Sequence, residues 1–232
     1  MSEPADDYAG PGPDTWHEQL RKLAEPPTSE RRRQAHRAGD ALRRLMAALH
    51  GTSAPPAEVA AIAEEVERLA DRLAPYPSTS LYLMESDTAG PDPVAFFDHS
   101  AVLGQGNPLA PPISLWRDGD LMRGRATFGA PYEGPPDCVH GGFVAAAFDE
   151  VLGSSQALGG RPGMTARLIV DYRSPTPLHT ELSFTAGVRA VEGRKTIMWG
   201  TLHAGERLCA EAEGLFVAVE SGPWPSRPGA GG

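Results

Sequence analysis

This 232-residue chain has only two cysteines, almost no lysine and no long apolar run. Cys138 and Cys209 lack the spacing of a metal motif and are too few for a disulfide framework. No apolar stretch reaches the length of a membrane span, and the opening residues, MSEPADDYAG, carry neither the basic charge nor the apolar segment of a secretion signal. We therefore expect a cytoplasmic protein without membrane insertion.

The common cofactor motifs are also missing from the sequence. It contains no H-E-x-x-H, no P-loop and no G-x-G-x-x-G, so we expect no metal and no nucleotide cofactor. The formal net charge of −9 argues against nucleic acid, or an anionic membrane surface, as a partner.

Changes in composition and periodicity divide the chain into five segments. Apolar residues that recur every three or four positions predict helices over 29–50 and 57–73, and a short helix is expected within 15–25. We expect a disordered tail at 1–14, a helical hairpin extension at 15–75, an irregular, proline-rich connector at 76–118, one globular domain at 119–221 and a flexible tail at 222–232.

The domain at 119–221 combines short extended runs with one long helix. The helix is expected over 140–158 and is closed by Gly159 and Gly160. Strands are expected over 121–129, 165–173, 181–191, 195–204 and 206–220, with tight turns at EGR and GE. This order predicts an α+β fold in which an antiparallel sheet wraps around the helix.

The stretch PPDCVHGGFVAAAFDEVLG, residues 135–153, carries the chemistry. Gly141 and Gly142 begin the helix, where unpaired backbone N–H groups and the positive end of the helix dipole favour an anion or an oxyanion. Asp149 lies within an apolar helix, where a carboxylate is costly unless it is solvated, paired or used. Together these features indicate acyl-group chemistry.

The chain resembles the PaaI-like hotdog-fold thioesterases, and most closely the subgroup that contains the mammalian carboxyl-terminal modulator protein. The resemblance covers about residues 95–220. It rests on NPLAPP (107–112), YEGPPDCVHGG (132–142), Asp149 nine residues after His140, PGMT (162–165), LIVDYRSPTPL (168–178) and EGRKT (192–196). It implies a hotdog fold and hydrolysis of acyl-CoA thioesters to free acid and CoA.

The resemblance also assigns roles to residues of this chain. Asp149 is expected to act as general base or nucleophile, the Gly141 N–H to bind the thioester oxygen, and Thr165 to orient the attacking water, with His140 opening the helix. The residues expected to bind the substrate or its CoA are Gly142, Asn107, Arg194 and Lys195. One departure is Gly134, at a position where many relatives carry Asn.

The spacing predicts an oligomer. Nine residues of helix span about 13.5 Å, so Gly141 and Asp149 of one chain cannot reach the same carbonyl. We therefore expect a homodimer, or a dimer of dimers, with active sites at the subunit interface.

Several alternatives stay open at this stage. Glu150 could be the base in place of Asp149, and Cys138 could be a nucleophile at the helix start. HGG is also part of the oxyanion loop of lipases, but no G-x-S-x-G elbow follows. A hotdog hydratase would need a different pair of acid–base residues. The hotdog domain could also be a non-catalytic module that binds acyl-CoA or recruits a partner.

We expect the helical hairpin to dock on the hotdog dimer.

Overall fold

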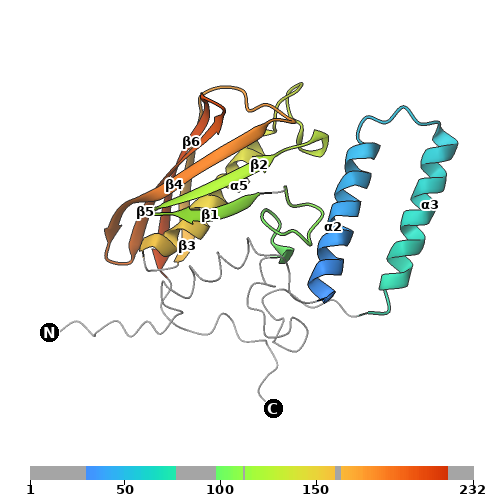
Figure 1. Cartoon of the computed structure of the whole chain (residues 1–232), viewed down its shortest axis with the longest axis horizontal. Coiled ribbons are helices and arrows are strands. Elements are labelled where there is room, and N and C mark those ends of the chain that lie inside the picture. Colours follow the sequence, from blue (N-terminus) through green and yellow to red (C-terminus); the bar gives the residue numbers. More distant parts are fainter. Residues whose placement is uncertain (1–29, 77–97, 112, 160–162, 219–232) are drawn as a thin grey trace, which may run out of the picture. The chain divides into compact units, whose positions relative to one another are not determined.

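The computed structural model describes residues 30–76, 98–111, 113–159 and 163–218 (Figure 1). The tails expected at 1–14 and 222–232, the short helix expected within 15–25, and much of the connector lie outside the described residues. The chain divides into two compact units, residues 27–109 and the remainder. Each unit is described by itself.

Two helices make up most of the described residues in the unit at 27–109. They are α2 (Glu30–Leu49) and α3 (Pro56–Leu73), so both helices of the predicted hairpin are confirmed. Gly51, two residues after the end of α2, adopts φ +66°, and Pro56 supplies the first residue of α3, where a missing N–H costs nothing. The apolar side chains of Leu69 and Leu73 are exposed on α3.

Residues 98–109 pack closely on α2. The buried Asp98 carboxylate accepts hydrogen bonds from Arg32 Nε at 2.5 Å and is 2.7 Å from His36 Nε2. A Cβ at Gly39 would lie 2.5 Å from the carbonyl oxygen of Gln105, so this helix position accepts only glycine. The buried ion pair and the close backbone approach fix this end of the predicted connector on the helix.

The second unit is a six-stranded antiparallel sheet around one long helix, α5 (Gly141–Ser155) (Figure 1). The strands are β1 (Ser114–Asp118), β2 (Leu121–Thr127), β3 (Gly163–Tyr172), β4 (Glu181–Glu192), β5 (Lys195–Ala204) and β6 (Arg207–Ala218). Their order is β1-β2-β4-β5-β6-β3, which leaves β3 at one edge. This is the α+β hotdog fold that the sequence predicts.

The core lies between α5 and the concave face of the sheet. Phe148 of α5 meets Phe184 of β4 edge to face, with ring centroids 5.7 Å apart. A Cβ at Gly200 would lie 3.0 Å from Leu152, so the glycine lets the helix approach the sheet. The core residues with less than 2% exposure include Phe128, Phe148, Phe184, Phe216, Met122, Met198, Val144, Val151 and Leu152.

Strand β1 was missed in the sequence, where its residues were assigned to the connector. It is a five-residue edge strand with one buried side chain, Leu115, so it has too little alternation to be recognised. Helix α5 ends at Ser155, earlier than predicted, and continues as the 3₁₀ turn η4 (Gln156–Gly159). Within the described ranges, no helix has the length and apolar character needed to cross a membrane.

Candidate active site

The start of α5 presents a free backbone donor. The His140 ring caps the helix, because its Nδ1 accepts a hydrogen bond from the Gly142 N–H at 3.0 Å. Tyr132 O accepts from the His140 N–H at 2.8 Å, which holds the incoming loop. The Gly141 N–H has no hydrogen-bond partner among the described residues. An unpaired N–H at a helix N-terminus is suited to bind an oxyanion.

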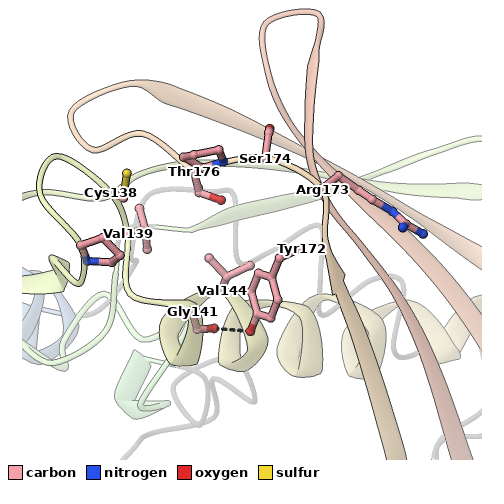
Figure 2. A pocket seen from close by; sticks show the side chains of 10 residues that line it. Cys138, Val139, Gly141, Val144, Tyr172, Arg173, Ser174 and Thr176 are labelled. Carbon is pink, nitrogen blue, oxygen red and sulfur yellow. Dashed lines mark hydrogen bonds between the residues drawn. The ribbon is translucent and has the colours of Figure 1, made fainter.

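Gly141 opens onto a pocket of about 500 Å³ (Figure 2). The Tyr172 hydroxyl, from the end of β3, donates a 2.8 Å hydrogen bond to the Gly141 carbonyl oxygen. The Tyr172 ring also lies close above Gly141, where an added Cβ would be 3.3 Å from it. The pocket is lined by Pro135, Cys138, Val139, Gly141, Val144, Tyr172, Arg173, Ser174, Pro175 and Thr176.

The conformation of the loop that leads into α5 explains why position 134 is glycine. A Cβ there would lie 2.7 Å from His140 Cα and 3.0 Å from His140 Cβ. The Gly134 N–H donates to Cys138 O at 2.9 Å, which closes the loop tightly. Asparagine therefore does not fit this loop conformation, and the polar contact expected of it in relatives is absent from this loop.

The predicted base, Asp149, lies just past the middle of α5. The Thr165 hydroxyl of β3 donates a 2.8 Å hydrogen bond to Asp149 Oδ1, and Asp149 is half-buried whereas Thr165 is exposed. Gly141 and Asp149 are eight positions apart in the helix, so the rise along its axis from one to the other is about 12 Å. The chain therefore holds both groups on one helix without bringing them to one carbonyl.

The predicted CoA-binding pair lies at the same end of the sheet as Thr165. Arg194 and Lys195 form the tip of the β4–β5 hairpin, where Gly193 adopts φ +58°. Lys195 pairs with Val217 in the sheet, and Val217 pairs on its other side with Met164, next to Thr165. The Arg194 guanidinium donates to the Ala218 carbonyl oxygen at 3.0 and 3.1 Å, so the tip is fastened to β6.

Known proteins that are similar to this chain identify its family. No family model matches the chain. A solved crystal structure of a thioesterase superfamily protein is 38% identical, with a TM-score of 0.71, and covers 83% of this chain and 97% of that protein. The chain belongs to the thioesterase superfamily. The predicted hotdog thioesterase family is thereby confirmed.

Two curated relatives are also named as thioesterases. Acyl-coenzyme A thioesterase THEM4 of Xenopus laevis is 37% identical over 92 residues, and THEM4 of Bos taurus is 31% identical over 110 residues. The matched segments cover 38% and 46% of this chain but only 41% and 45% of those relatives. This superfamily member therefore matches less than half the length of the curated relatives.

The similarity to the solved thioesterase reaches beyond the sheet unit. Residues 110–232 make up just over half of the chain, so coverage of 83% must include much of the region before residue 110. The similarity to this superfamily member therefore extends into the part of the chain before residue 110.

Asn107 has a local role in this thioesterase-family chain. Its side-chain nitrogen donates to His99 O at 3.1 Å, and its side-chain oxygen accepts from the Leu109 N–H at 3.0 Å. Asn107 belongs to the unit at 27–109 and is not among the residues that line the Gly141 pocket. Its role in substrate binding stays a prediction.

Three pocket residues were given no individual role in the sequence analysis. Tyr172 and Thr176 fall within the LIVDYRSPTPL motif, but in sequence they look like ordinary strand and loop residues. Arg173 also lines the pocket. The pKa of its guanidinium is raised, mainly by the hydrogen bond with Glu211 and next by the charge of Asp171.

Of the other candidates, Cys138 lines the pocket, and Glu150 is half-buried on α5. The described parts of the chain contain no cluster of three His, Cys, Asp or Glu side chains that could hold a metal.

Proposed function

We propose that this protein hydrolyses acyl-CoA thioesters to free acid and CoA. The observation that carries the proposal is the pairing of two features in one thioesterase-superfamily domain. Asp149 is held by Thr165 at 2.8 Å, and the Gly141 N–H at the start of the same helix is unpaired among the described residues. The matched relatives named acyl-coenzyme A thioesterase support this substrate class.

In the proposed reaction, Asp149 takes a proton from a water molecule while the water oxygen bonds to the thioester carbon. Negative charge develops on the thioester oxygen and is stabilised by the Gly141 N–H and the positive end of α5. When the tetrahedral intermediate collapses, the carbon–sulfur bond breaks. The CoA sulfur leaves and takes the proton held by Asp149, which restores the carboxylate.

Thr165 was expected to orient the attacking water, and in this scheme it does so through Asp149. Its hydroxyl occupies Asp149 Oδ1, which leaves Oδ2 to accept the proton of the water. The hydrogen bond also fixes the rotation of the carboxylate, because the bulged edge strand β3 holds Thr165 in place.

We further propose that each active site combines two chains. Gly141 and Asp149 of one chain are about 12 Å apart along α5, too far to act on one carbonyl. Strand β3 is a sheet edge that exposes Met164, Ile169 and Tyr172 at 51%, 43% and 55%, which is unfavourable unless a second subunit covers it. In a symmetric dimer, Gly141 of one protomer would lie beside Asp149 and Thr165 of its partner. The symmetry would create two such sites in each dimer.

Arg194 and Lys195 are proposed to bind the CoA phosphates. The proposal is supported by the basic charge of both residues and by the position of the hairpin tip at the Thr165 end of the sheet. Because Arg194 is already bonded to Ala218 O, its guanidinium is oriented before the ligand arrives.

A thiol-release assay with a panel of acyl-CoAs, run in EDTA, tests the proposed function. The proposal predicts saturable release of CoA for at least one acyl class. Titration calorimetry with the same panel separates it from a non-catalytic module, which would bind acyl-CoA without releasing thiol. Binding without turnover across short, long and aromatic acyl groups would reject the enzymatic function.

A further inference from the structure

Thr176 carries a buried hydroxyl that has no hydrogen-bond partner in the part of the chain that the structure describes. Thr176 is 5% exposed, and among the described residues no group bonds to its Oγ1. Other hydroxyls near it are satisfied locally: Ser174 Oγ donates to Leu208 O at 2.7 Å, and Thr180 Oγ1 to Leu178 O at 3.1 Å. A buried hydroxyl without a partner destabilises the fold, so such groups in proteins call for an explanation.

This hydroxyl lines the same pocket as the Gly141 N–H. Figure 2 shows the Thr176 oxygen on the side of the loop that faces Val144 and Gly141. The walls between these polar groups are largely apolar and come from Pro135, Val139, Val144, Tyr172 and Pro175. The pocket thus holds two hydrogen-bonding groups without a partner among the described residues, in apolar surroundings, which is the pattern of a ligand site.

The position of Thr176 is fixed by the backbone that leads to Gly141. The Val139 N–H donates to Thr176 O at 2.8 Å, and Cys138 forms an antiparallel bridge with Pro177. Threonine is also branched at Cβ, which restricts its side-chain rotation. The hydroxyl is therefore preorganised at a fixed offset from the proposed oxyanion donor.

We propose that Thr176 is a specificity-determining residue that hydrogen-bonds a polar group of the bound thioester, close to its carbonyl. This inference rests on the proposed thioesterase function. A hydroxyl both donates and accepts, so its partner is an amide or hydroxyl group. That group comes either from the acyl chain, as a hydroxyl near the thioester, or from the thiol side, as the amide of the pantetheine arm. A substrate that lacks the group leaves Thr176 unpaired and is disfavoured.

The test compares Thr176→Val, which keeps the shape and removes the hydroxyl, with Thr196→Val. Thr196 is a matched control because it is 3% exposed, on β5, and does not line the pocket. Three thioesters of one acyl length are used: the saturated acyl-CoA, its 3-hydroxy analogue, and the ethanethiol ester, which has no pantetheine amide. Thermal melting of each variant is measured in parallel.

The inference predicts that kcat/KM of Thr176→Val falls about tenfold or more only for substrates that carry the recognised group. Loss confined to the 3-hydroxy substrate identifies the acyl side. Loss for both CoA esters, but not for the ethanethiol ester, identifies the pantetheine amide. The melting temperature should not fall, because the hydroxyl has no protein partner to lose. Thr176→Ser should keep the wild-type preference.

Several results would overturn the inference. If kcat/KM of Thr176→Val stays within about twofold of wild type for all three thioesters, Thr176 does not contribute to substrate recognition, although the thioesterase function stands. Equal losses in Thr176→Val and Thr196→Val would mean a packing effect. If wild type hydrolyses none of a broad acyl-CoA panel, the proposed function itself fails and this inference fails with it. Should Thr176→Val not fold, Thr176→Ser and Thr176→Ala give the same comparison.

Discussion

A mixing experiment tests the proposed sharing of the active site between two chains. One variant is Asp149→Asn, which lacks the base. The other is Gly141→Pro, which lacks the oxyanion donor because proline has no N–H. Proline suits the first position of a helix, and His140 before it has φ −58° and ψ 130°, a conformation that proline tolerates in its neighbour. Gly141→Pro should therefore fold.

The recovered activity can be worked out from the geometry. Because Gly141 and Asp149 lie about 12 Å apart on α5, each homodimer of a variant has two defective sites. A heterodimer has one site with both lesions and one with neither. If subunits exchange freely at equal amounts, half of the dimers are mixed and half of their sites work. The mixture should then recover about a quarter of wild-type activity.

The assay is thiol release before and after subunit exchange, with exchange followed by mass spectrometry of differently tagged chains. Gly141→Ala is the matched control for the proline variant, because it keeps the N–H and brings the same Cβ, 3.3 Å from the Tyr172 ring. It should lose much less activity than Gly141→Pro. Verified exchange without any recovery would refute the shared site.

Two further predictions concern the supports of the site. Tyr172→Phe removes the hydroxyl that bonds Gly141 O but keeps the ring, so kcat should fall up to about tenfold with little change in KM; an unchanged kcat would show that this bond does not position the donor. Deleting residues 1–75 removes Arg32 and His36, the partners of Asp98, together with helix α2, against which that carboxylate is packed. The truncated protein should melt at lower temperature or change its acyl-length preference, while its activity still depends on Asp149. Equal stability, oligomeric state and substrate profile would instead place the hairpin in a complex with another protein.

The regular elements could be predicted because their side chains repeat with a clear period. The apolar stripe of α3 and the alternation of β5 gave bounds within one residue of those observed. β1 could not be recognised, because an edge strand with one buried residue has no repeat to detect. Gly134 was noticed as a departure, but its close approach to His140 depends on how the loop folds back and is not visible in sequence.

The site was only partly predictable for a related reason. Asp149 and Gly141 stand out because a carboxylate and a glycine pair are unusual in an apolar helix, and Thr165 came from the family resemblance. Tyr172 cannot be distinguished in sequence from other aromatic residues of strands, so its hydrogen bond to Gly141 O was not predicted. Thr176 gives no signal at all, because a missing hydrogen-bond partner is a property of the fold and not of the residue type.

The most direct test of the proposed mechanism is the turnover of Asp149→Asn. The substitution is nearly isosteric and keeps an oxygen that can accept the Thr165 hydrogen bond, but it removes the proton acceptor. We predict that thiol release falls by about a hundredfold or more while calorimetry still detects acyl-CoA binding, and that the neighbouring control Glu150→Gln stays much closer to wild type. Near wild-type hydrolysis by purified Asp149→Asn would contradict the mechanism, and a matching collapse in Glu150→Gln would move the base to Glu150.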